Sequence, residues 1–294
     1  MLQAFAMVEV ELQRLCWKPS NSYELFRKAV LVIRLERFFL LIEMMQKSFF
    51  LFVLLSLTSL AKGQGQEQIL RHSWNLSAIG YDMVECRKDQ ERDSCLQRFN
   101  QTLDSLMVLP GSFDHQFDSV KNIRILNSPD QSFRILTWGF RHPNDSFEFF
   151  GILQFADAKR EAIWLSDSSK ALKNENATLY KTLDPANWYG GLYYQIEKVR
   201  YKKETYYLLL GWNGHNAKTD QKILEILSFD ENEEPVFGLP ILDMDNQQGY
   251  QCRVIWEYKN GANMALQIES DELITFEHIE PADSRAKGIY TLYL

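Results

Sequence analysis

The sequence lacks every short motif that would identify a catalytic or cofactor-binding site. Its 4 cysteines and 5 histidines are scattered along 294 residues, without the close pairs that form a zinc site. No nucleotide-binding loop and no local signature of an activated nucleophile is present. We therefore expect no cofactor, and the sequence favours a protein that is not an enzyme.

Basic residues are too few for a nucleic-acid-binding surface. Residues 1–63 contain 8 of the 32 Lys and Arg residues and 5 of the 39 Asp and Glu residues, so residues 64–294 carry a formal charge of −10. Because nucleic-acid phosphates need a basic surface, we expect no nucleic acid partner.

The most apolar segment, residues 48–61 (SFFLFVLLSLTSLA), follows Lys47 and precedes Ala61-Lys62-Gly63. A signal peptide has an uncharged core of roughly 7 to 15 residues, whereas a membrane span needs roughly 20. The pattern predicts a signal peptide over residues 44–63, cleavage after Gly63 and a new N-terminus at Gln64. It indicates an exported protein, periplasmic or secreted, which contacts a membrane only through an uncleaved signal peptide.

Residues 1–43 precede this leader and mix apolar residues with charges such as Arg34 and Glu36. A signal peptide begins close to an initiator Met, so we interpret residues 1–43 as an over-extended gene model. The alternative is an amphipathic helix over residues 23–42 or an uncleaved anchor, either of which would tether the protein to a membrane.

Residues 64–112 are predicted to be a helical N-terminal segment. From 93 to 108 the apolar residues recur at intervals of three and four, which is typical of an amphipathic helix, and Pro110-Gly111 ends the pattern.

From residue 113 the apolar period changes to two, which predicts an antiparallel β domain over residues 113–294. Turn residues divide it into three sets of four strands, so the fold class is mainly β, built from successive four-stranded meanders. Such repeats suggest either propeller-like blades or a sandwich. The predicted strands are 122–126, 133–140, 147–155 and 162–166; 192–199, 205–212, 223–229 and 236–242; and 252–258, 262–269, 273–279 and 289–294.

One hairpin is predicted in register. A three-residue loop at residues 259–261, with Gly261 left-handed, would pair Trp256 with Met264 and Val254 with Leu266 and so match the apolar faces of two strands.

Export to an oxidising compartment would allow a disulfide between Cys86 and Cys95 to form. On a continuous helix these two residues lie on opposite faces, so bridging requires a helix break between them. The alternative is that the cysteines, including Cys252, are buried free thiols.

Two aromatic segments are candidate ligand-binding sites. Trp188, Tyr189 and Tyr193 flank a pair of glycines and could stack on sugar rings, or could instead fill the core between strands. Trp212, Asn213 and His215 end a very apolar strand, where a loop could display them; Asn-Gly is also an ordinary turn signal.

Asp243 and Asp245, followed by Gly249, resemble the start of a calcium-binding loop. The match then fails, because the fifth position is Gln247 and the glycine falls one residue late. Local hydrogen bonds in a turn explain the same residues.

The segments SPDQSFRILTWGF, GGLYYQIEKVRYKKETYYLLLGWNGHN, KILEILSF and RVIWEYKNGANM are similar to a family of uncharacterised exported bacterial proteins. The similarity spans residues 113–294. It implies a periplasmic or secreted β protein of unknown activity. Members of that family continue with a further aromatic segment, so a C-terminal truncation of this chain is expected.

The sequence thus favours an exported, non-enzymatic binding or structural protein, with an envelope glycan or another protein as its partner. The alternative is a periplasmic hydrolase acting on glycan or envelope material. A third possibility is a subunit of a surface complex.

Overall fold

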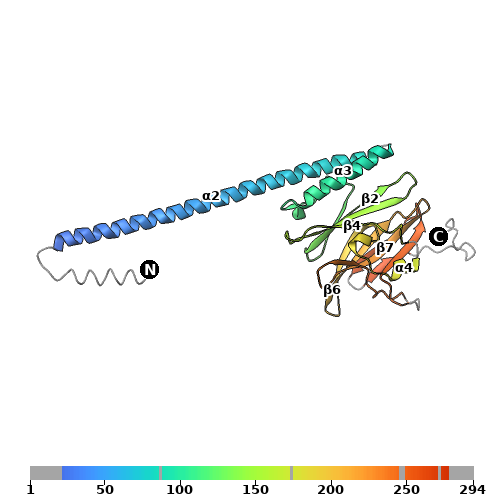
Figure 1. The fold of residues 1–294 in the computed structure, drawn as a ribbon. Coiled ribbons are helices and arrows are strands. Elements are labelled where there is room, and N and C mark those ends of the chain that lie inside the picture. The colour runs from blue at the N-terminus through green and yellow to red at the C-terminus, as the bar shows by residue number, and fades with distance from the viewer. Residues whose placement is uncertain (1–21, 86–87, 173–174, 245–248, 271–272, 278–294) are drawn as a thin grey trace, which may run out of the picture. The chain divides into compact units, whose positions relative to one another are not determined.

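The computed structural model describes residues 22–85, 88–172, 175–244, 249–270 and 273–277 (Figure 1). The chain divides into two compact units, Met1–Gln64 and Gly65–Leu294. This boundary falls one residue from the predicted cleavage site. Helix α2, Ser22–Glu85, runs through the predicted leader and ends in the second unit. None of the helices in the described part of the chain is sufficiently long and apolar to cross a membrane.

In the second unit, the end of α2 and helix α3, Asp89–Met107, pack against one face of a β-sheet (Figure 1). The helix predicted over 93–108 is confirmed and begins four residues earlier. It ends before Gly111, whose φ of 86° is the left-handed conformation that glycine tolerates best. The shared core includes Leu76 of α2, Phe99 of α3 and Trp138 of the sheet, all completely buried.

The first sheet is a four-stranded antiparallel meander in the order β1-β2-β3-β4. The first predicted set of strands is therefore confirmed. These strands form because short polar turns join runs of apolar residues with a period of two. The strands are β1 Arg124–Asn127, β2 Phe133–Arg141, β3 Phe147–Phe155 and β4 Ile163–Ser166.

The second sheet contains the second predicted meander and one further strand. Its order is β5-β6-β7-β8, and β9 also pairs with β7. The strands are β5 Leu192–Tyr201, β6 Glu204–Asn213, β7 Thr219–Phe229, β8 Pro235–Phe237 and β9 Arg253–Lys259.

The predicted pairing of the 252–258 strand with the 262–269 strand is wrong. β8 covers only the last three residues of β7, and β9 occupies the rest of the same edge, from Glu225 opposite Arg253 to Thr219 opposite Lys259. Gly261 is left-handed as predicted, with φ of 82°. The turn forms, but it leads the chain out of the sheet.

The remaining described strands, β10 Leu266–Ser270 and β11 Leu273–Phe276, form a separate hairpin. Leu266 and Ile268 cover the outer face of the second sheet, where they contact Leu210, Leu224 and Val254. The last predicted strand, residues 289–294, lies outside the described residues. The short helices are η1 Ser112–Asp114, α4 Glu175–Tyr180 and η2 Pro185–Asn187.

The two sheets face each other across the main core. Phe133, Phe149 and Leu153 of the first sheet share one buried cluster with Leu209 and Ile223 of the second. Face-to-face packing of antiparallel sheets is the architecture of a sandwich, and the described strands form no closed barrel. The mainly β fold of successive meanders with an N-terminal helix is thus confirmed.

Asp130, in the turn between β1 and β2, joins the two sheets. It accepts hydrogen bonds from Lys198 Nζ at 2.6 Å, Tyr207 Oη at 2.8 Å and Ser132 Oγ at 2.7 Å. Burial alone would raise the pKa of Asp130, but these hydrogen bonds, with one from Ser128, outweigh it and hold the pKa well below its usual range.

Candidate functional site

The predicted aromatic segment at 188–193 lies in the core. Trp188 and Tyr193 are completely buried and Tyr189 is 4% exposed. Trp188 Nε1 donates to Tyr193 Oη at 2.8 Å, and Tyr189 Oη donates to Gln221 Oε1 at 2.7 Å. These rings therefore have packing roles, and no face is open for a sugar to stack upon.

A buried ion pair lies behind these aromatic residues. Tyr193 Oη donates to Glu225 Oε2 at 2.5 Å, and Arg253 Nε donates to Glu225 Oε1 at 2.7 Å, with both charged side chains completely buried. The guanidinium also donates to the carbonyl oxygens of Thr178, Lys181 (2.9 Å) and Phe237 (3.2 Å). Because each of its three nitrogens donates to a protein oxygen, this network fixes the 178–181 segment and β8 to the sheet rather than forming a ligand site.

The glycine pair at 190–191 has a steric explanation. The backbone N–H of Gly190 lies 3.3 Å from Asp167 Oδ1, and a Cβ built on Gly190 would come within 2.5 Å of that oxygen. Asp167 also accepts from Phe149 N at 3.0 Å and Ser169 N at 2.8 Å. Glycine is therefore needed here for the close approach of two loops.

The second predicted segment lies at one end of the sandwich and is only partly accessible. Asn213 is 3% exposed, and its amide donates to Gly190 O at 2.6 Å. Trp212 is half-buried, with its ring centroid 5.3 Å from that of Phe147. His215 is exposed. Of the six predicted ligand-binding residues, only Trp212 and His215 reach solvent appreciably.

Next to Trp212, a carboxyl and an ammonium group have perturbed pKa values in opposite directions. Burial raises the pKa of Asp220, while a hydrogen bond with Trp212 and the charges of Arg141 and Lys222 partly oppose this rise. Burial lowers the pKa of Lys222, opposed by the charge of Asp220. Such groups gather at functional sites more often than elsewhere.

Strand register brings this group together. Asp220 lies opposite Tyr258, and Lys222 lies between Trp212 and Trp256 on the neighbouring strands. Lys222 Nζ lies 4.6 Å from the ring centroid of Tyr194. Burial raises the pKa of Tyr258 to about 12, with the charge of Asp220 adding to the rise.

We define the Trp212 site as Trp212, Asp220, Lys222 and Tyr258. It brings together an aromatic ring (Trp212), a hydrogen-bond acceptor (Asp220) and a cation (Lys222), all partly accessible to solvent. This combination suits a polar ligand that also has an apolar face. Of these four residues, only Trp212 was predicted from the sequence. Asp220 and Lys222 gave a weak signal, two charges at alternate positions in the polar first part of β7.

The β2–β3 hairpin adjoins this site through Phe147, which also lines a hollow of about 470 Å³. Arg141 Nη2 lies 2.7 Å from Asp145 Oδ1, and His142 Nε2 lies 3.2 Å from Glu148 Oε2. The hollow is open and is lined by Met83, Val84, Arg92, Gly139, Phe140, Arg141, His142, Pro143, Asp145 and Phe147.

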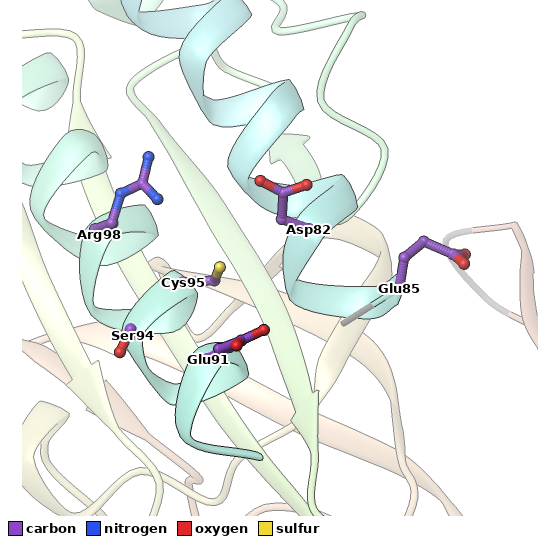
Figure 2. A pocket seen from close by; sticks show the side chains of 6 residues that line it. All are labelled: Asp82, Glu85, Glu91, Ser94, Cys95 and Arg98. Carbon is purple, nitrogen blue, oxygen red and sulfur yellow. The ribbon is translucent and has the colours of Figure 1, made fainter. Parts of the chain in front are cut away.

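A second hollow, of about 530 Å³, lies between α2 and α3. Figure 2 shows the Cys95 sulfur facing the space between the helices, with Asp82 on the opposite helix. Glu85 and Glu91 also line the hollow. Within the described ranges, no group of three or more His, Cys, Asp or Glu residues is arranged to hold a metal ion. The acidic lining therefore gives no metal centre.

Two sequence predictions involve residues outside the described part. Cys95 and Cys252 are buried thiols, but Cys86 is not among the described residues, so its pairing with Cys95 stays a prediction. Asp243 is exposed, and its proposed calcium partner Asp245 also lies outside the described residues. The calcium site therefore stays a prediction too.

The chain matches no protein-family model, no curated protein and no solved structure. The similarity of residues 113–294 to exported bacterial proteins therefore stays an interpretation of the sequence.

Proposed function

We propose that residues 64–294 are an exported binding module, periplasmic or secreted, and that the Trp212 site is its ligand-binding surface. The single observation that carries this proposal is the juxtaposition of Asp220 and Lys222, each with a perturbed pKa, beside a half-buried tryptophan ring. A glycan is the ligand class that fits best. Sugars present an apolar ring face to tryptophan and hydroxyl groups to a carboxylate and an ammonium.

The module is proposed to be non-enzymatic because its site supplies one carboxyl with a raised pKa. Glycoside hydrolysis uses two carboxyl groups facing one bond. A hydrolase acting on envelope material is the second candidate, and Asp220 would then be its general acid. A structural role as a subunit of a surface complex would leave the Trp212 site without a small ligand.

A melting-temperature screen tests the proposal. The purified protein is melted alone and with peptidoglycan fragments, common oligosaccharides and divalent metal ions. A ligand at a hundredfold excess over Kd adds about 2.7 kcal/mol to the free energy of unfolding. At roughly 2–4 °C per kcal/mol for a domain of this size, the melting temperature should rise by roughly 5–11 °C.

The matched variants are Trp212→Ala and Tyr201→Ala, the second being an aromatic residue 47% exposed in the β5–β6 hairpin. We expect Trp212→Ala to abolish the ligand-induced shift and Tyr201→Ala to keep it. No shift with any glycan, or a shift that survives Trp212→Ala, would contradict the proposed site. Release of reducing sugar that disappears in Asp220→Asn would establish the hydrolase instead.

A further inference from the structure

The end of α2 exposes a stripe of large apolar side chains. Leu70 is 44% exposed, Trp74 74%, Tyr81 66% and Val84 64%. At about 100° of rotation per residue, these four positions fall within an arc of about 80° on the helix. The stripe lies to one side of the buried face that carries Leu76. This second apolar face is not needed for packing the helix against its own sheet.

The stripe is large enough to form a specific interface. Aromatic side chains such as Trp74 and Tyr81 bury roughly 150–250 Å² each when fully covered. Together with Leu70 and Val84, and because all four are already partly covered, the stripe offers roughly 500 Å² of accessible surface. Two such faces pressed together would bury roughly 1,000 Å², which is the size at which specific protein interfaces begin. Isolated exposed apolar residues are ordinary, but four of them aligned on one helix face mark an interaction surface. Ser77, which lies between Trp74 and Tyr81 on this face, donates to Ser119 O at 2.7 Å.

We propose that this stripe binds the same stripe of a second copy of the chain, with the two α2 helices antiparallel and a two-fold axis near Ser77. A two-fold interface requires a self-complementary surface. In this arrangement positions equally distant from the axis meet, so Trp74 of each copy packs on Tyr81 of the other. Leu70 and Val84 lie at the two ends of the stripe and close it on both sides.

Charges beside the stripe fit the same arrangement. Arg71 and Glu85 lie on the same flank, roughly 60–100° from Leu70 at about 100° per residue. In an antiparallel pair, equivalent flanks face each other, and the two-fold axis brings Arg71 of one copy to Glu85 of the other, twice. Arg71 Nη2 also lies 2.9 Å from Glu67 Oε1 of its own helix, which holds the guanidinium on this flank.

A membrane surface suits the stripe less well than a second copy. Membrane-surface helices carry Lys and Arg on their polar face, whereas the flank of this stripe carries three carboxylates, Glu67, Asp82 and Glu85, against the single basic residue Arg71. The net charge of −10 over residues 64–294 also opposes attraction to anionic lipids.

Sedimentation velocity of the purified protein over a range of concentrations tests the inference. The protein should be a dimer that dissociates on dilution. Trp74→Ser should raise the dimer Kd by roughly 30-fold or more, since a buried tryptophan at an interface centre is a typical hot spot. The matched control is Val108→Ser, because Val108 is 79% exposed just after α3 and lies outside the stripe; it should leave the Kd unchanged.

Exchange of the charges at residues 71 and 85 distinguishes the proposed dimer from non-specific hydrophobic association. Arg71→Glu and Glu85→Arg should each raise the Kd roughly tenfold, as expected for two exposed pairs per dimer, and the double variant should restore it. A monomer at every concentration would overturn the inference, as would a dimer that both Trp74→Ser and the charge exchange leave unchanged. Binding of the monomer to phosphatidylglycerol vesicles, lost in Trp74→Ser, would make lipid the occupant and would also overturn it.

Discussion

Glu225 Oε1 accepts a hydrogen bond from Arg253 Nε at 2.7 Å, and neither side chain has any exposed surface. The two residues are direct partners in the β7–β9 pairing. Their ion pair stabilises the register of β9 against β7. Because Arg253 also donates to the carbonyl oxygens of Thr178 and Lys181, the same side chain holds the 178–181 segment in place.

Removal of one member of this pair should destabilise the domain strongly. Glu225→Gln leaves the Arg253 guanidinium buried without a counter-charge, which typically costs about 3–5 kcal/mol. The double variant Glu225→Met, Arg253→Met should lose less than the sum of the two single changes, because no uncompensated charge remains. Urea unfolding measures the free energy of unfolding of the wild type, of each single variant and of the double variant. Glu67→Ala, in an exposed pair, serves as control and should cost no more than about 0.5 kcal/mol. A loss below about 1 kcal/mol in Glu225→Gln would mean that the pair is solvated in solution.

Acid should weaken the junction between the two sheets. The folded-state pKa of Asp130 is lowered, so its contribution to stability is fully present above the ordinary value of about 3.9 and is lost as the pH falls toward the folded-state pKa. The melting temperature of the wild type should therefore fall more steeply below about pH 5 than that of Asp130→Asn. Asp118→Asn, a change at an exposed carboxyl, provides the comparison. Parallel curves for wild type and Asp130→Asn would contradict this account.

Several parts of this structure were predictable from the sequence because local patterns decide them. The period-two apolar runs and polar turns predicted the strands of the first sheet, and the three- and four-residue spacing predicted α3. The pairing of β9 was not predictable, because Asn260-Gly261 indicates a local hairpin with the strand that follows. β9 instead pairs with β7, since β8 covers only three residues of β7 and leaves the rest of that edge free for β9.

The candidate site was predictable only in part for a similar reason. Tryptophan and tyrosine look alike in sequence whether they fill a core, as Trp188 does, or stand at a rim, as Trp212 does. The perturbed pKa values of Asp220 and Lys222 depend on burial and on neighbours from other strands. Strand register therefore had to be known before either residue could be recognised.

Replacement of Gly190 should strain the contact with Asp167. The added methyl group of Gly190→Ala would lie within 2.5 Å of Asp167 Oδ1, and overpacking of this kind typically costs about 1–3 kcal/mol. Asp167→Ala in the same chain should recover part of the loss by making room. The control is Gly65→Ala, whose methyl group would meet only Pro110 O at 3.8 Å and should be neutral or stabilising by up to about 1 kcal/mol within the helix. Equal stability of the two alanine variants would count against the steric explanation.

The central claim is that the β domain is exported and released from its leader. The most direct test is to express the full chain in bacteria, collect the exported fraction, and determine the intact mass and N-terminal sequence of the protein in it. The exported chain should begin at Gln64, and Ala61→Arg should block this processing because cleavage requires small residues beside the site. A chain that keeps residues 44–63 and stays with the cells, in the wild type as in Ala61→Arg, would contradict export by a cleaved signal peptide.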